Sequence, residues 1–253
     1  MFRARVIPCL LLRGSGLVKT RKFADPVYIG DPLNAMRIFS EKEVDELVVL
    51  DIEASRLGRE PDYELIAEIA GEAFMPVAYG GGIRTLAQVR QLIRCGIEKV
   101  VINSITAEST DVIRAAADQF GSQAVVGSID VKKALLGGYK VMIKSGSVEL
   151  KTKLDEQVRK LVAAGVGELF LNSIDRDGMM QGYDLELIRG VAQSVKVPVV
   201  ACGGAGTLAH LAEAINLAGA SAVSAGSMFV FHGKHKAVLI SYPKPEELKK
   251  LFG

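Results

Sequence analysis

Short apolar segments alternate with longer amphipathic segments along most of the chain. Eight apolar segments lack a strict alternation with polar residues, at 6–12, 47–52, 76–79, 100–103, 124–129, 169–172, 198–202 and 222–225. Strands that are apolar on both faces are typical of a parallel sheet covered by helices. Helical spacing of apolar residues recurs between them, at 86–95, 111–119, 154–164, 184–194 and 208–217. Eight such units in 253 residues favour a closed (β/α)8 TIM barrel of class α/β. We expect one domain over 1–253.

The second half of the chain repeats the first half. The segment MPVAYGGGIRTL at 75–86 aligns with VPVVACGGAGTL at 197–208, an offset of 122 positions that also pairs Glu46 with Glu168. A repeat of half the chain predicts two half-barrels, which a closed barrel accommodates. The one irregular stretch, 134–151, contains glycine-rich turns and predicts a β-hairpin after the fifth strand.

Composition narrows the classes of partner and compartment. The formal net charge is only +2, which does not favour nucleic acid or an anionic membrane as a partner. Cys9, Cys95 and Cys202 lie far apart, so we expect neither a disulfide framework nor a zinc site, and a reducing cytoplasm. No segment approaches the roughly 20 apolar residues that cross a bilayer. His232 and His235 lack a nearby third ligand and are interpreted as surface residues, so no metal and no cofactor are expected.

Glycine clusters follow one strand in each half of the chain. They are Gly80–Gly82 and Gly203–Gly204, and each precedes a small polar pair at the end of the next strand, Asn103-Ser104 or Gly226-Ser227. Glycine lets the backbone approach a ligand closely, and barrel active sites lie at these strand ends. Two related sites predict a small molecule with a phosphate at each end. The alternative is that the glycines only close tight turns.

Seven motifs, in order, resemble one known family. They lie at 7–10 (IPCL), 30–32 (GDP), 45–47 (DEL), 80–83 (GGGI), 120–124 (FGSQA), 173–178 (SIDRDG) and 203–206 (GGAG). Together they resemble the cyclase subunit of imidazole glycerol phosphate synthase, a lyase of histidine biosynthesis. The resemblance implies that a glutaminase subunit docks on the bottom of the barrel and sends ammonia through it. At the top, the family uses ammonia to cleave and cyclise a bisphosphorylated ribulosyl aminoimidazole carboxamide.

The resemblance also implies roles for individual residues. The phosphate sites would comprise Gly81, Gly82, Asn103, Ser104, Asp177, Gly178, Gly203, Gly204, Gly226 and Ser227. A ring of charge at the bottom would gate the ammonia, formed by Arg5, Glu46, Lys99 and Glu168, each directly before an apolar strand. Without the resemblance, this ring reads equally well as a salt-bridged plug. Lys19 and Phe23 would lie in a long loop after the first strand that closes over the substrate. Glu98 and Gln123 would share the bottom face with the ring.

One of the family's two catalytic aspartates is missing. The aspartate of the fifth strand is present as Asp130, but the first strand reads Pro-Cys-Leu-Leu and places Leu11 where the family has aspartate. Aligning the first strands of the two halves with each other, 10–13 opposite 129–132, shows the same loss. Leucine cannot transfer a proton, and a positioned acid or base contributes about 10²–10⁴-fold in rate. Other departures from the family pattern are Thr20, Asn172, Met179 and Cys202.

Three functions remain open at this point. The first is a diverged subunit that passes ammonia to a separate enzyme, as associated with similar paralogues in surface-polysaccharide synthesis, where an acetamido sugar becomes an acetamidino sugar. The second is a genuine cyclase of histidine biosynthesis in which another group, such as Asp51 or Asp177, replaces the missing acid. The third is a noncatalytic barrel that stimulates the glutaminase and senses a bisphosphate. The first is favoured.

Overall fold

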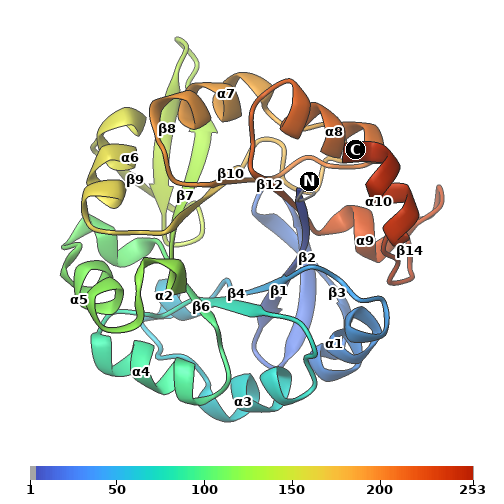
Figure 1. Cartoon of the computed structure of the whole chain (residues 1–253), viewed down its shortest axis with the longest axis horizontal. Helices are drawn as coiled ribbons and strands as arrows, with labels where there is room; N and C mark the ends of the chain where they lie inside the picture. Colours follow the sequence, from blue (N-terminus) through green and yellow to red (C-terminus); the bar gives the residue numbers. More distant parts are fainter. Residues whose placement is uncertain (1–3, 253) are drawn as a thin grey trace.

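Within residues 4–252, which the computed structural model describes, eight parallel strands close into a barrel (Figure 1). In spatial order they are β1 (Arg5–Arg13), β4 (Leu47–Asp51), β5 (Val77–Gly80), β6 (Lys99–Ile102), β7 (Val125–Lys133), β10 (Glu168–Ser173), β11 (Val199–Cys202) and β12 (Ala222–Ala225). Pairing of β12 with β1 closes the sheet. The predicted TIM barrel is therefore confirmed, with strand bounds that differ by at most one residue, except at the end of β7, which extends four residues further.

Helices surround the barrel on all sides (Figure 1). The longer ones are α1 (Pro32–Glu41), α3 (Tyr63–Gly71), α4 (Leu86–Arg94), α5 (Asp111–Phe120), α6 (Leu154–Ala163), α7 (Leu185–Ser194), α8 (Leu208–Asn216) and α10 (Pro245–Phe252). Short ones are α2 (Ala54–Leu57), α9 (Ser227–Val230) and the 3₁₀ turns η1 (Ser104–Ala107) and η2 (Ser122–Ala124). Thr85 and Thr207, which the repeat pairs, cap α4 and α8 with their hydroxyl oxygens, so both halves start these helices alike. None of the helices in the described range is long and apolar enough to cross a membrane.

Two hydrophobic layers hold the barrel together. The outer layer lies between the strands and the helices, and includes Phe39, Leu161 and Phe229. The inner layer fills the bore with side chains from alternating strand positions: Ile7, Cys9, Val48, Ala78, Val101, Val126, Phe170, Val200, Cys202 and Ala222. The bore is therefore lined by a buried apolar layer between the two ends of the barrel.

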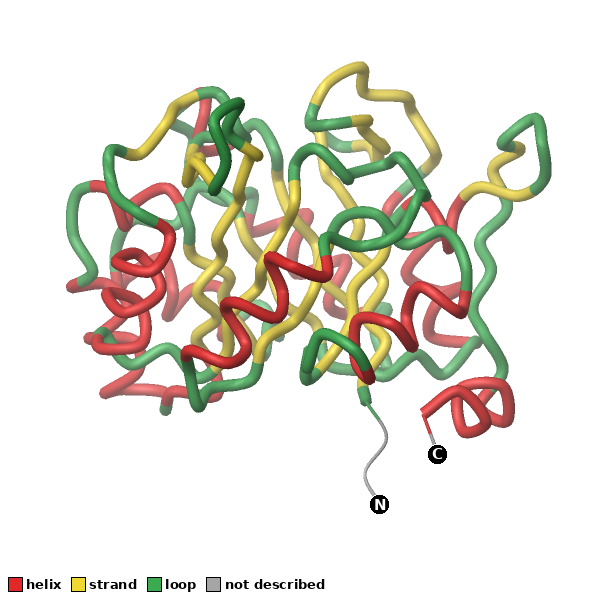
Figure 2. The backbone as a smooth tube through the Cα atoms, turned by 90° about the horizontal axis from the view of Figure 1, so that it is seen from above, coloured by secondary structure: helices red, strands yellow, loops and turns green. Residues whose placement is uncertain are grey.

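Three hairpins extend from the C-terminal ends of the strands. The predicted hairpin after the fifth strand is confirmed as β8 (Tyr139–Ile143) and β9 (Val148–Leu150). The predicted loop after the first strand was wrong: β2 (Gly16–Arg21) and β3 (Ala24–Gly30) form a second hairpin, because β1 continues and pairs antiparallel with β2. The third is β13 (Phe231–His232) with β14 (Ala237–Val238). All three lie at the end of the barrel opposite the chain termini (Figure 2).

Candidate functional site

A cavity opens at the C-terminal ends of the barrel strands and contains about 1140 Å³ of space, part of it open to solvent. Every residue that the sequence predicted for the top of the barrel borders it: Leu11, Lys19, Gly81, Gly82, Asn103, Ser104, Asp130, Asp177, Gly178, Gly203, Gly204, Gly226 and Ser227. The structure thus brings together residues from both halves of the repeat. Its place at the C-terminal ends of the strands is where (β/α)8 barrels bind small molecules.

The glycine turns of the two halves adopt the same kind of backbone. Gly81 and Gly82 have φ values of +129° and +72°, and their repeat partners Gly203 and Gly204 have +87° and +120°. A β-carbon added to Gly204 would lie 2.2 Å from the carbonyl oxygen of Gly182. These turns therefore require glycine for both conformation and space.

Replacing Gly204 by alanine is expected to lower the free energy of unfolding by about 2 kcal/mol or more, because strain and a backbone clash combine. The matched control is Gly190→Ala in α7, where an added β-carbon meets no atom within 4 Å. That change should stabilise the protein by about 0.5–1 kcal/mol. Chemical denaturation measures both, and an equal response of the two variants would contradict the requirement for glycine.

Side chains at the predicted phosphate sites are already hydrogen-bonded to other groups of the protein. Asn103 Nδ2 donates to Asp130 Oδ2 at 2.7 Å, and Ser104 Oγ accepts from the backbone N–H of Lys144 at 3.1 Å. Lys19 Nζ donates to the carbonyl oxygen of Cys9 and fills the space beside Gly226. These three side chains are therefore hydrogen-bonded within the protein, and the glycine turns present backbone to the cavity beside them.

Asp130 lies at the floor of the cavity and is 8 % exposed. Burial and, to a smaller extent, the negative charge of Asp177 raise the pKa of its carboxyl to about 7, although the hydrogen bond from Asn103 opposes the rise. An acid with a pKa near neutrality is suited to proton transfer at physiological pH. Asp130 therefore has the properties of a general acid or base.

No second carboxylate occupies the position that pairs with Asp130. Leu11 is in register with Leu50, and Asp130 with Asn172, and the repeat pairs Leu50 with Asn172. Leu11 therefore occupies the equivalent place in the first half of the barrel. It borders the cavity with an apolar side chain.

The two candidate substitutes for the missing acid are engaged elsewhere. Asp51 Oδ1 accepts the backbone N–H groups of Glu53 and Ala54 at 2.8 and 2.9 Å. Asp177 Oδ2 accepts from the hydroxyl of Thr20 at 2.8 Å. Burial raises the pKa of the Asp177 carboxyl, while Thr20, Lys19 and the backbone of Phe23 lower it. Both carboxyl groups border the cavity but are hydrogen-bonded within the protein.

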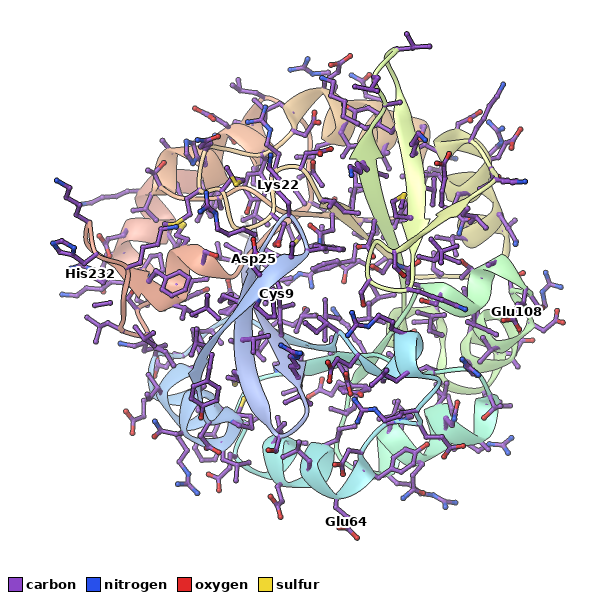
Figure 3. All side chains as sticks on the ribbon, turned by 180° about the vertical axis from the view of Figure 1, so that it is seen from behind. Cys9, Lys22, Asp25, Glu64, Glu108 and His232 are labelled. Atoms are coloured by element: carbon purple, nitrogen blue, oxygen red, sulfur yellow. The ribbon has the colours of Figure 1, made fainter. Side chains whose placement is uncertain are left out.

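The β2–β3 hairpin is fixed across the mouth (Figure 3). Besides the bond from Thr20, the backbone N–H of Lys22 donates to the carbonyl oxygen of Asp177 at 2.9 Å. Lys19 is 5 % exposed and lies inside the cavity wall rather than in a solvated loop. The substitution of glycine by Thr20 thus supplies a bond that holds this hairpin closed.

The sequence did not anticipate two further wall residues, Ser55 and Ser145. Ser55 Oγ accepts from the backbone N–H of Gly82 at 3.2 Å, and Ser145 reaches the wall from the β8–β9 turn. Cys202 and Cys9 share a hydrogen bond that lowers the pKa of Cys9 and raises that of Cys202. The serines carry no sequence signal of their own, whereas the pairing of the cysteines follows from their facing positions in the bore.

Four charged side chains meet at the bottom of the bore, as predicted for the ring. Arg5 donates to both Glu46 and Glu168, and Lys99 Nζ contacts Glu46 at 2.8 Å and Glu168 at 3.2 Å. Burial lowers the pKa of Arg5, but hydrogen bonds and the charges of the two glutamates outweigh this and raise it. The four residues therefore form a closed, mutually neutralised ring across the barrel base.

His232 and His235 are exposed on the β13–β14 hairpin, and Figure 3 shows His232 pointing away from the barrel. In the described part of the chain, no three His, Cys, Asp or Glu side chains cluster as metal ligands.

Fold and cavity define the class: a (β/α)8 barrel built from two related halves, with a ligand-sized cavity at the C-terminal strand ends. The chain belongs to the histidine biosynthesis protein family, which matches residues 5–236. A relative from Pseudomonas aeruginosa is named "Putative imidazole glycerol phosphate synthase subunit hisF2". It is 57 % identical over 248 residues, which cover 98 % of this chain and 99 % of the relative's chain. Similarly named proteins are HisF of Leptospira borgpetersenii, 49 % identical over the whole of both chains, and hisF3 of Vibrio vulnificus, 47 % identical over 99 % of this chain and 96 % of its own. The chain is a divergent paralogue of the cyclase subunit.

Proposed function

We propose that this barrel receives ammonia from a glutaminase subunit, conducts it through the bore and delivers it to a separate enzyme. That enzyme would aminate a nucleotide sugar in surface-polysaccharide biosynthesis in the cytoplasm. The observation that carries the proposal is the contrast between the two ends of the barrel. The base keeps all four charged residues in contact, whereas the mouth has Leu11 in place of an acid.

The base of the barrel supports a glutaminase as the partner. Phe74 is 92 % exposed in the turn between α3 and β5, and Leu217 is 59 % exposed between α8 and β12. A shallow groove borders the same face and includes Phe120, Gln123 and the exposed Glu98. Phenylalanine is one of the aromatic residues enriched in protein interfaces.

The mouth supports delivery rather than consumption of ammonia. With one acid or base instead of two, proton transfer to the reacting atoms is incomplete, which lowers turnover by about 10²–10⁴-fold. The sugar class rests on the resemblance to paralogues of polysaccharide synthesis. The acceptor enzyme would therefore bind at the top face, where the cavity opens.

A genuine cyclase is the alternative, with an activity in histidine biosynthesis. The arrangement of Asp130, Lys19 and the paired glycine turns around one cavity favours it. In this case the bisphosphate would bind between the two glycine turns, and another proton donor would be required.

An isotope experiment tests the proposed channelling. Glutaminase, barrel and a nucleotide-sugar aminating enzyme receive glutamine labelled with ¹⁵N in its amide, in excess unlabelled ammonium. The sugar product should keep the ¹⁵N label, because channelled ammonia does not mix with solvent. Label diluted to the solvent ratio would contradict channelling and favour a barrel that only stimulates the glutaminase.

The bore offers a matched pair of variants for this experiment. Ala78 faces the bore and Ala116 faces the outer layer, and both are fully or nearly fully buried. Ala78→Leu should obstruct the bore and dilute the ¹⁵N label in the sugar product. Ala116→Leu overpacks the outer layer but should leave the amount of label unchanged. The same loss of label in both variants would mean that the bore is not the route.

A further inference from the structure

The β7–β9 hairpin presents two consecutive leucines to solvent at its tip. Leu135 and Leu136 are 105 % and 103 % exposed, and a β-carbon added to Gly137 or Gly138 would meet no atom within 4 Å. The tip extends beyond the ring of helices in Figures 1 and 3. No residue in the range 4–252 covers these side chains.

Positive charge is concentrated on the same hairpin. Segment 132–153 contains six lysines and one glutamate, in a chain whose formal net charge is +2. All six are exposed: Lys132, Lys133, Lys140, Lys144, Lys151 and Lys153. Of these, only Lys140 forms an ion pair with another described residue, with Glu149 at 2.6 Å. Lys132 and Lys133, at the end of β7, lie directly before the apolar tip and form no ion pair with another described residue, whereas Lys144 lies at the β8–β9 turn and Lys151 and Lys153 follow β9.

The hairpin is held rigidly at its base. β7 and β8 pair from Asp130 with Met142 to Lys133 with Tyr139. The hydroxyl of Tyr139 donates to Asp184 at 3.1 Å, and the backbone N–H of Lys133 donates to Asp175 at 2.6 Å. A fixed hairpin loses little conformational entropy when its tip binds.

The size of the tip decides between a protein and a bilayer as its partner. A stable protein interface buries about 800 Å² on each partner, far more than two leucines on a four-residue turn offer. A bilayer interface needs no complementary pocket: it buries exposed leucines among the acyl chains, while its anionic headgroups attract nearby lysines. We propose that the β7–β8 tip inserts into the surface of an anionic phospholipid bilayer and anchors the barrel there. The net charge of the whole chain did not favour an anionic membrane as a partner. That net charge does not report the local positive charge of one hairpin.

Anchoring would also orient the mouth of the barrel. The β8–β9 turn of the same hairpin borders the cavity through Ser145, whose hydroxyl donates to the carbonyl oxygen of Ile52 at 2.6 Å. The membrane-held hairpin and the cavity wall are thus one continuous segment. The cavity would open close to the membrane surface. This inference does not depend on the identity of the reaction that the barrel serves.

Vesicle flotation of the full chain tests the proposal. Vesicles of phosphatidylcholine mixed with phosphatidylglycerol should carry the protein, and pure phosphatidylcholine vesicles should carry much less. Binding should weaken about fivefold for each lysine replaced, as in Lys132→Gln and Lys133→Gln, and should fall at about 0.5 M salt.

A double substitution tests the leucines themselves. Leu135→Ser with Leu136→Ser should weaken binding at least about tenfold. The matched control, Leu57→Ser with Leu217→Ser, removes two exposed leucines elsewhere and should bind as the native protein does. Equal binding to both kinds of vesicle, or undiminished binding by the tip variant, would overturn the proposal. The proposal would also be overturned if the tip variant still bound vesicles but no longer associated with an acidic protein partner.

Discussion

Arg5→Ala is expected to lower the free energy of unfolding by about 2–3 kcal/mol. Arg5, like Lys99, contacts both Glu46 and Glu168, and the side chains of the two glutamates are only 4 % and 8 % exposed. Removing one partner of a buried ion pair commonly costs about 3–5 kcal/mol, because a buried charge is left uncompensated. The Arg5 side chain is 32 % exposed, so solvent screening reduces the effect.

An exposed ion pair provides the control for this substitution. Arg37 contacts Glu72 at 2.7 Å, but its side chain is 57 % exposed. Arg37→Ala should therefore leave the stability nearly unchanged. Urea denaturation compares the two variants. If both cost equally little, the charged ring at the base does not act as a buried, coupled network.

The stability of the Asp130→Asn variant relative to the native protein is expected to increase as the pH rises. The pKa of Asp130 is about 7 in the folded protein and near 3.8 without the fold, mainly because burial disfavours its charge. The neutral carboxyl therefore contributes stability that is fully present below about pH 4 and is lost as the pH rises through 7. About three pKa units correspond to about 4 kcal/mol. Asparagine stays neutral, so the variant should gain on the native protein by about this amount between pH 4 and pH 8.

Denaturation of both proteins at a series of pH values measures this difference. Asn103→Ala is the useful companion, because Asn103 donates to Asp130 at 2.7 Å and favours its charged form. Loss of this bond should move the transition to higher pH. A native-to-variant difference that stays constant from pH 4 to pH 8 would show that burial does not raise the pKa of Asp130.

The barrel was predictable from sequence because its signals are local and repeated. Apolar strand segments recur eight times, and the 122-residue offset relates three strands of the first half to strands of the second half. The β2–β3 hairpin escaped prediction because Lys19 and Thr20 are polar, yet both are buried by contacts with distant parts of the chain. Such contacts exist only after the barrel has closed.

The site was predictable to a similar extent, and for a similar reason. The turn at Gly203 and Gly204 needs positive φ values and has no room for a side chain, so only glycine fits there. Glycine in the sequence therefore marks the position of the turn. The pairings of Asn103 with Asp130 and of Thr20 with Asp177 join residues 27 and 157 positions apart. No local pattern encodes them, and they decide which side chains remain free for a ligand.

Cyclase turnover of the purified barrel, with the bisphosphate substrate and excess ammonium, tests the central claim most directly. Leu11→Asp is measured beside it, since it restores a carboxyl at the position that the repeat pairs with Asp130. The account predicts no detectable imidazole glycerol phosphate from the native protein while it stays folded and still binds a glutaminase. Robust native turnover would contradict it and return this chain to histidine synthesis.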